Sequence, residues 1–304
     1  MTDKVVFILG IGRSGSTMLD LILGSHSQGF SLGEISKLPQ IYRQTPSLDA
    51  FCPVGTFWPD HFSDEDAKQL AQGLSGRRLR PYMPLRVERW LREITGQDAV
   101  FNPYTLLAAR IRKGLLIDSS KYPDWIARRL EAREFRQDHL QAYVIHAVRD
   151  GRAVLNSYLR AYPELTVDQV SHRWLNNLHA CEQLYASIPT NRRMQVRYEV
   201  LATNPESTVR QVCDFLDIRF EQNMLEYWKH DHHYIAGSRS ARALIARYRQ
   251  QPVASNTQAV HGDYYSKVDM TIKLDQRWRQ ELAEEKIARF YEIIGDLNQP
   301  FEWA

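Results

Sequence analysis

A glycine-rich loop near the N-terminus has the composition of an anion-binding site. It reads Gly10-Ile11-Gly12-Arg13-Ser14-Gly15-Ser16-Thr17 and lies between a β-branched and aromatic run, Lys4–Leu9, and a helical pattern, Thr17–Leu23. Glycines let the backbone curl so that several N–H groups point at one anion, and the helix that follows adds the positive end of its dipole. A tight strand-to-helix turn without a ligand is the alternative. We expect six loop residues to hold a phosphate group: Gly12, Arg13, Ser14, Gly15, Ser16 and Thr17.

The loop differs from the nucleoside-triphosphate loop at one informative position. The spacing of Gly10 and Gly15 fits the Walker A frame, but Ser16 stands where the lysine that contacts the β- and γ-phosphates belongs. Arg13 supplies the positive charge from inside the loop, which suits a single terminal anionic group. A P-loop kinase or another nucleotide phosphotransferase is therefore only an alternative interpretation.

Arg149 marks a second candidate anion site. It follows the buried-strand pattern Ala142–Val148, and Ser157 comes eight residues later. Two turns of helix would bring Ser157 back to a face that can share one anion with Arg149. An ion pair with Asp150 or with another carboxylate is the alternative for an arginine at a strand end. Two anion sites at neighbouring strand ends fit a nucleotide with phosphates at both its 3′ and 5′ positions, whereas ATP chemistry does not need the second site.

These motifs together resemble the sulfotransferases that use 3′-phosphoadenosine 5′-phosphosulfate (PAPS). The stretch GRSGST after a hydrophobic strand is similar to the family's 5′-phosphosulfate loop, and Arg149 with Ser157 is similar to its 3′-phosphate motif. The arginine inside the loop resembles the tyrosylprotein and carbohydrate branches more than the cytosolic aryl branch. Tyr198, in Val196–Leu201 followed by Asn204-Pro205, resembles a family segment whose tyrosine sits by the adenine.

The resemblance also implies the reaction and its catalytic residues. A sulfuryl group would pass from PAPS to a hydroxyl acceptor, with 3′,5′-adenosine bisphosphate as the product and no metal. Glu34, in a Gly-Glu pair, matches the general base of tyrosylprotein sulfotransferases, and a carboxylate within about 3 Å can take the acceptor proton. Arg13 and Lys121 would neutralise the transferring group. A capping or surface glutamate and a solvated lysine are the alternatives.

Residues 231–242 contain an alternative base and a further donor-binding element. The element resembles a family segment with a histidine and a Gly-Asn-x-x-Arg motif, which is replaced here by Gly237-Ser238 and two arginines, so its register stays open. His232 and His233 are the alternative base, although paired loop histidines usually lie at the surface. We expect three residues of the element to contact the donor: Ser238, Arg239 and Arg242.

The remaining pattern predicts an α/β fold, with a P-loop-like parallel sheet wrapped by helices. The runs expected as strands are Lys4–Leu9, Leu115–Ile117, Ala142–Val148 and Met194–Arg197. The runs expected as helices are Val167–Ile188, Pro205–Leu216 and Gln276–Ile294, and Asn204 is expected to be the N-cap of the second. We expect one sulfotransferase domain over residues 1–304. It would carry a proline-rich helical cap insertion at 44–105, with a helix at Asp64–Leu74, and a mobile loop at 250–263.

The composition limits the classes of binding partner and the cellular compartment that we expect. A formal charge of +3 on 304 residues is too small to indicate nucleic acid or an anionic membrane, so an anion site must be local. Three widely spaced cysteines form neither a disulfide framework nor a metal quartet. With no secretory signal and no apolar run near 20 residues, we expect a cytoplasmic protein. The acceptor stays open among small molecules, carbohydrates, lipid headgroups and peptides, and a non-catalytic nucleotide-binding protein is a second alternative.

Overall fold

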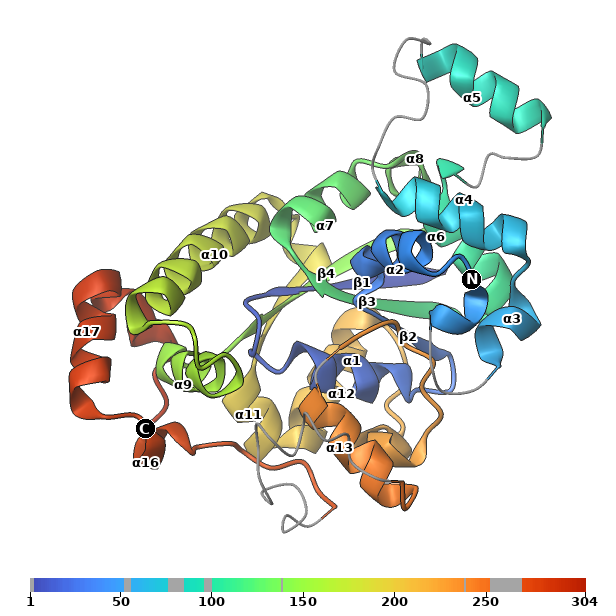
Figure 1. The fold of residues 1–304 in the computed structure, drawn as a ribbon. Helices are drawn as coiled ribbons and strands as arrows, with labels where there is room; N and C mark the ends of the chain where they lie inside the picture. The colour runs from blue at the N-terminus through green and yellow to red at the C-terminus, as the bar shows by residue number, and fades with distance from the viewer. Residues whose placement is uncertain are drawn as a thin grey trace.

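A five-stranded parallel sheet forms the centre of the molecule (Figure 1). The computed structural model describes residues 3–51, 56–75, 85–95, 100–137, 139–237, 239–251 and 270–304. The strands are β1 (Lys4–Gly10), β2 (Gly29–Gly33), β3 (Leu115–Lys121), β4 (Gln141–Val148) and β5 (Arg193–Arg197). Their order is β2-β3-β1-β4-β5, and all neighbours are parallel. The predicted fold class is confirmed.

The strands read as apolar runs because the sheet is covered on both faces. All seven residues of β1 are buried. Val5, Phe7 and Leu9 join the hydrophobic cluster on one face, and Val6 and Ile8 join the cluster on the other. The predicted strands are confirmed, whereas β2 was not predicted because its five residues, GFSLG, begin and end with glycine and have polar neighbours.

Helices cover both faces of the sheet (Figure 1). The cluster around Phe7 contains residues of α2 (Leu38–Gln44), α4 (Asp64–Ser75), α6 (Pro103–Ile111), α7 (Pro123–Leu130) and α10 (Val167–Ser187). The opposite cluster contains residues of α1 (Ser16–Gly24), α11 (Tyr198–Thr203), α12 (Pro205–Leu216), α13 (Arg239–Tyr248) and the 3-10 helix η5 (Gln222–Lys229). A third cluster joins α9 (Gly151–Ala161) and α10 to α17 (Glu284–Ile294).

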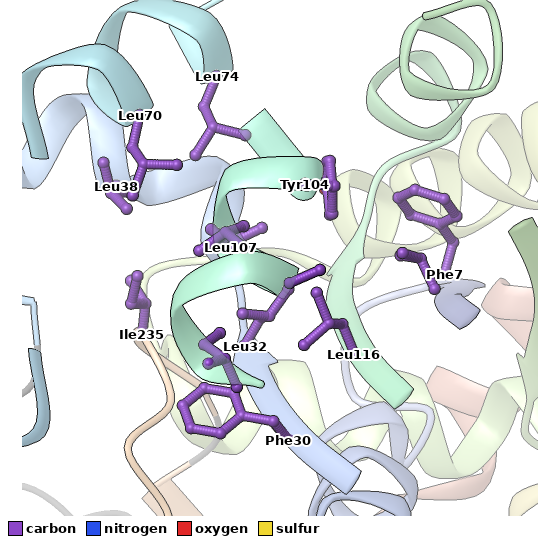
Figure 2. Packing of buried hydrophobic residues seen from close by; sticks show 14 of the residues in the cluster. Phe7, Phe30, Leu32, Leu38, Leu70, Leu74, Tyr104, Leu107, Leu116 and Ile235 are labelled. Carbon is purple, nitrogen blue, oxygen red and sulfur yellow. The ribbon is translucent and has the colours of Figure 1, made fainter. Parts of the chain in front are cut away.

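Helices make up most of the described part of residues 44–105, and the role of this insertion as a cap stays a prediction. Its own helices are α3 (Phe57–His61), α4 and α5 (Leu85–Ile94), and α6 starts at its end. Leu70 and Leu74 of α4 and Leu107 of α6 belong to the same cluster as Phe7 of β1 (Figure 2). The insertion therefore shares the core of the sheet. The predicted mobile loop lies outside the described residues from 252 onward.

Two local predictions need correction. The run Gln276–Ile294 is not one helix but two, α16 (Trp278–Glu281) and α17, separated where Leu282 and Ala283 adopt extended backbone angles. This break lets Trp278 and Phe290 both reach the interior. Asn204 does precede α12, but its side chain donates to the Thr203 hydroxyl instead of capping the helix.

The remaining elements are short connections. They are η1 (Ile35–Lys37), η2 (Leu48–Ala50), α8 (Arg133–Arg136), η4 (Thr190–Arg192) and η6 (Gly295–Phe301). No helix in the described ranges combines the length and the apolar character needed to cross a membrane.

A core substitution tests whether the insertion and the sheet unfold together. Leu107→Ala removes a fully buried side chain between them, so we expect the free energy of unfolding to fall by about 2–5 kcal/mol. Urea unfolding, followed by tryptophan fluorescence and by circular dichroism, should still show one transition. Leu297→Ala, at a side chain that is 36% exposed, is the control and should change stability little. A separate, earlier transition of the insertion would contradict the shared core.

Candidate active site

The predicted site residues of β1 to β5 lie at one edge of the sheet. Because all five strands are parallel, their carboxyl ends meet there, which is where open parallel sheets bind ligands. The glycine loop follows β1, and Lys121 is the last residue of β3. Glu34, Arg149 and Tyr198 directly follow β2, β4 and β5 respectively. The sequence motifs are therefore brought together by the topology of the sheet.

Two aromatic rings pack closely against glycines of the loop, because these glycines have no side chain. A Cβ on Gly15 would lie 2.5 Å from Cδ2 of Tyr198, and Gly15 also has a positive φ of 82°. A Cβ on Gly12 would overlap the hydroxyl of Tyr158 on α9. Side chains at these positions would push the rings off the loop. Glycine is therefore required here both for the turn and for close packing.

Arg13 has a strained backbone and is held on the α9 side of the loop. Its φ is 74°, in the left-handed region that residues other than glycine seldom adopt. Its guanidinium carbon lies 5.9 Å and 5.5 Å from the ring centroids of Tyr158 and Tyr162, within the range of cation–π attraction. Ser16 and Thr17 open α1 beside it, at the positive end of the helix dipole. This arrangement concentrates positive potential at the loop.

Glu34 lies between two lysines. Its Oε1 accepts a hydrogen bond of 2.5 Å from Nζ of Lys121, and its Oε2 forms an ion pair with Lys37. Burial alone would raise the pKa of this carboxyl, which is 8% exposed, but the charge and hydrogen bond of Lys121, with those of Lys37, lower it below its usual value. Glu34 is therefore a charged, paired carboxylate and not a capping or surface glutamate.

Asp118 orients the end of β3, where Lys121 lies. Its carboxylate accepts hydrogen bonds from the Tyr104 hydroxyl (2.6 Å), from Nε1 of Trp125 (2.8 Å) and from the backbone N–H and hydroxyl of Ser120. Complete burial raises the pKa of Asp118 despite these donors. Lys121 follows with a φ of 75° and also donates to the carbonyl of Ser119. Lys121 is thus a buried, positioned lysine and not a solvated one.

Arg149 links the second anion site to the glycine loop. Its Nη1 donates a hydrogen bond of 3.0 Å to the carbonyl oxygen of Arg13, and its guanidinium carbon lies 4.2 Å from the ring centroid of Tyr198. Asp150, the alternative partner, instead binds Arg152 and the backbone N–H of Trp303. Asp150 is therefore not the ion-pair partner of Arg149, whereas the Asp275 carboxylate lies 3.9 Å from its Nη2.

Three charged residues beside Arg149 were not predicted: Arg160, Asp275 and Arg277. Asp275 belongs to the segment before α16, and its backbone carbonyl accepts a hydrogen bond of 3.0 Å from Nη2 of Arg149. Its carboxylate contacts Arg160 of α9 and Arg277. No motif identified this cluster, because Asp275 and Arg149 are 126 residues apart.

Tyr198 and Glu199 join the strand ends to one another. The Tyr198 hydroxyl accepts a hydrogen bond from the backbone N–H of Asp275, and its ring lies between Gly15 and Arg149. Glu199 accepts a hydrogen bond of 2.9 Å from the backbone N–H of Asp150. The adenine contact expected of Tyr198 stays a prediction.

The other predicted site residues have different surroundings. Ser157 is buried on α9, after Arg149 in the chain. His232 lies with Nε2 2.7 Å from the carbonyl of Tyr227, and burial lowers its pKa to about 4. The ring of His233 stacks on the ring of Phe57, with 4.7 Å between the ring centroids. Ser238 and the side chains of Arg239 and Arg242 lie outside the described part of the chain.

Comparison with known proteins identifies the family. The model of the sulfotransferase family matches residues 5–222, so the chain belongs to that family. Its fold is similar to that of the sulfotransferase domain from the curacin biosynthetic pathway, with 18% identity, a TM-score of 0.58 and 99% of both chains covered. It is also similar to the sulfotransferase domain of the Synechococcus PCC 7002 olefin synthase, with 20% identity and a TM-score of 0.55. This match covers 94% of this chain and 95% of that domain.

A longer relative matches at the level of sequence. An uncharacterized protein of Aquifex aeolicus (strain VF5) is 24% identical over 236 residues, which are 75% of this chain and 27% of that protein. The chain thus spans about a quarter of the length of this curated relative.

The lowered pKa of Glu34 predicts a pH-dependent contribution to stability. Its ionised form stabilises the fold above its usual pKa of 4.5, and this contribution is lost as pH falls through the folded-state pKa. Glu34→Gln should therefore lower the free energy of unfolding at pH 7 by about 1–3 kcal/mol, and the deficit should shrink at pH 3. Urea unfolding at both pH values measures it. Glu206→Gln, in an exposed pair with Arg210, is the control, and a deficit independent of pH would contradict the prediction.

Proposed function

We propose that the protein transfers a sulfuryl group from PAPS to a hydroxyl acceptor by in-line displacement and releases 3′,5′-adenosine bisphosphate. The observation that carries the proposal is the hydrogen bond from Arg149 to the carbonyl of Arg13. It joins two cationic sites that are 136 residues apart in sequence. A ligand with two anionic groups on one small molecule can occupy both sites at once.

The glycine loop would hold the 5′ end of the donor. Its backbone, the hydroxyls of Ser16 and Thr17 and the N-terminus of α1 are suited to a phosphate group. The guanidinium of Arg13 would lie beside the sulfuryl group and stabilise the charge that develops on the leaving phosphate. A kinase reaction is the weaker candidate because Ser16 replaces the lysine that contacts the β- and γ-phosphates.

The 3′-phosphate would bind at the end of β4. The sequence motif assigns Arg149 and Ser157 to this phosphate. Arg160, which lies on α9 with Ser157, adds a positive charge next to Arg149. Tyr198, stacked on Arg149 and on the loop, would support the adenosine between the two phosphates.

Glu34 and Lys121 would carry out the transfer. Lys121 would turn from Glu34 to the sulfuryl oxygens as negative charge develops on them. Glu34 would lose one of its two paired cations at that moment, so its pKa would rise as it takes the proton of the acceptor hydroxyl. The acceptor oxygen forms the new S–O bond, and the bond between sulfur and the 5′-phosphate oxygen breaks. His232 is a poorer base because its ring is buried against the Tyr227 carbonyl.

The acceptor would approach from the side of β2 and the cap insertion. Glu34 starts the turn into η1 and α2, and its backbone N–H donates to the carbonyl of Ile235. The segment that leads into α2 and the segment around Ile235 therefore both border the proposed base. The cap insertion and residues 250–263 would shape the acceptor pocket. Incubation with ³⁵S-labelled PAPS and pools of carbohydrate, lipid, peptide and small phenolic acceptors would identify the acceptor class.

Donor binding tests the two-anion site without knowledge of the acceptor. Calorimetric titration should show tighter binding of 3′,5′-adenosine bisphosphate than of 5′-AMP, because only the former reaches Arg149. Arg149→Ala should weaken the bisphosphate by about 1.5–3 kcal/mol and weaken 5′-AMP less, because 5′-AMP depends on Arg149 only through the hydrogen bond to the loop. Equal affinities of the wild-type protein for the two nucleotides would contradict the proposal, and tighter binding of ATP with Mg²⁺ would favour the kinase.

Glu34→Gln tests the chemical step. The amide keeps the shape of the carboxylate but cannot accept the proton, so the rate of sulfuryl transfer should fall by about 10²–10⁴-fold. Affinity for 3′,5′-adenosine bisphosphate should stay within a few-fold of wild type. Transfer of label from ³⁵S-PAPS to the identified acceptor measures the rate. A near-normal rate would remove Glu34 from the mechanism and direct attention to His232 and His233.

A further inference from the structure

Residues 273–277 lie across the guanidinium of Arg149. The backbone carbonyl of Asp275 accepts a hydrogen bond from Nη2 of Arg149, and its backbone N–H donates 3.1 Å to the Tyr198 hydroxyl. The same hydroxyl lies 3.4 Å from the carbonyl oxygen of Lys273. The segment therefore occupies Nη2 of Arg149, while Nη1 binds the glycine loop.

The Asp275 carboxylate is an internal anion among three arginines, and it binds them unequally. Arg277 makes hydrogen bonds of 2.8 Å to both carboxylate oxygens. Nη2 of Arg149 and Nη2 of Arg160 lie 3.9 Å and 3.8 Å from Oδ2, beyond hydrogen-bond distance. Burial would raise the pKa of Asp275, but Arg277 and then Arg149 lower it well below its usual range. The carboxylate is thus ionised at neutral pH, and it attracts Arg149 and Arg160 without hydrogen-bonding them.

Arg149 has unused capacity for a better anion. It is 8% exposed, and within the described residues its buried Nε has no hydrogen-bond partner. A buried donor without an acceptor costs free energy. A phosphate has three terminal oxygens and can supply short, charge-assisted hydrogen bonds to a guanidinium. Exchanging the distant carboxylate for a phosphate is therefore favourable at Arg149.

The segment is anchored at both ends by apolar packing, whereas its centre is held by polar contacts. Met270 and Ile272 pack against the hydrophobic cluster that covers α1 and α12. Trp278 is buried on the other side, with the guanidinium of Arg152 stacked 4.3 Å above its ring. A local displacement of Asp275 together with its close partner Arg277 would leave these anchors in place.

We propose that Asp275 determines the affinity for the 3′-phosphate by competing with it for Arg149 and Arg160. In the nucleotide-free protein the carboxylate and the carbonyl of Asp275 occupy Arg149. The arriving 3′-phosphate displaces them, and their return helps to expel the bisphosphate product. The inference rests on the proposed function, since it takes the 3′-phosphate as the ligand of Arg149.

Removal of the competing negative charge should tighten binding of the bisphosphate but not binding of 5′-AMP. Asp275→Asn removes the negative charge that attracts Arg149 and Arg160 but keeps the backbone carbonyl that binds Nη2 of Arg149. The nucleotide-free state is then less favoured, so the apparent affinity for the phosphate rises. We expect the dissociation constant of 3′,5′-adenosine bisphosphate to fall about ten-fold and its dissociation rate to slow. The dissociation constant of 5′-AMP, which has no 3′-phosphate, should change by less than two-fold. Calorimetry and stopped-flow fluorescence on the full chain measure these quantities.

Asp168→Asn is the matched control, because Asp168 forms an exposed carboxylate–arginine pair with Arg289 on the helices α10 and α17. It should bind both nucleotides as wild type does. Unchanged or weaker bisphosphate binding by Asp275→Asn, with the wild-type preference for the bisphosphate over 5′-AMP intact, would overturn this inference alone. A wild-type protein without that preference would overturn the proposed function as well.

Hydrogen exchange of the wild-type protein gives a second test that does not depend on the stability of a variant. The backbone N–H of Asp275 is hydrogen-bonded to Tyr198, so displacement should expose it. Exchange in residues 273–277 should become faster on binding of 3′,5′-adenosine bisphosphate and should not do so with 5′-AMP. Equal or slower exchange with the bisphosphate would contradict displacement of Asp275.

Discussion

The covering of the parallel sheet on both faces is the constraint on which the rest of the structure depends. β1 and β3 are buried along their whole length, so the interior of the sheet has little room for unpaired charged groups. Charged side chains collect where the strands end. Because all five strands run in the same direction, the residues after β1, β2, β3, β4 and β5 collect at one edge, whatever their separation in sequence.

The edge is rich in positive charge, and carboxylates of the same chain balance it. Glu34 offsets Lys121 and Lys37, and Asp275 offsets Arg149, Arg160 and Arg277. In the proposed reaction these carboxylates are exchanged for the anionic groups of the donor. Lys121 would exchange Glu34 for the sulfuryl oxygens, and Arg149 would exchange Asp275 for the 3′-phosphate. Charge balance would therefore be retained while the donor binds.

The sequence was sufficient where a signal is local. β1, β3 and β4 are apolar runs next to recognisable loops, so their positions and the residues that follow them could be predicted. The sequence of β2 is short, with a glycine at each end, and gives no strand signal of its own. It forms a strand because it pairs in parallel with β3. The sequence could not show whether Arg149 contacts Asp150 or a carboxylate far away in the chain. The fold shows it, because Arg152 and the backbone N–H of Trp303 already bind Asp150. The break before α17 arises in the same way, from the burial of both Trp278 and Phe290.

The central claim is that one nucleotide bridges the ends of β1 and β4. A crystal structure of the protein with 3′,5′-adenosine bisphosphate tests it most directly. The account predicts the 5′-phosphate within hydrogen-bond distance of backbone N–H groups in the loop 10–17 and the 3′-phosphate at the guanidinium of Arg149. A nucleotide bound elsewhere, or one with its 3′-phosphate in solvent while Arg149 still contacts Asp275, would contradict it.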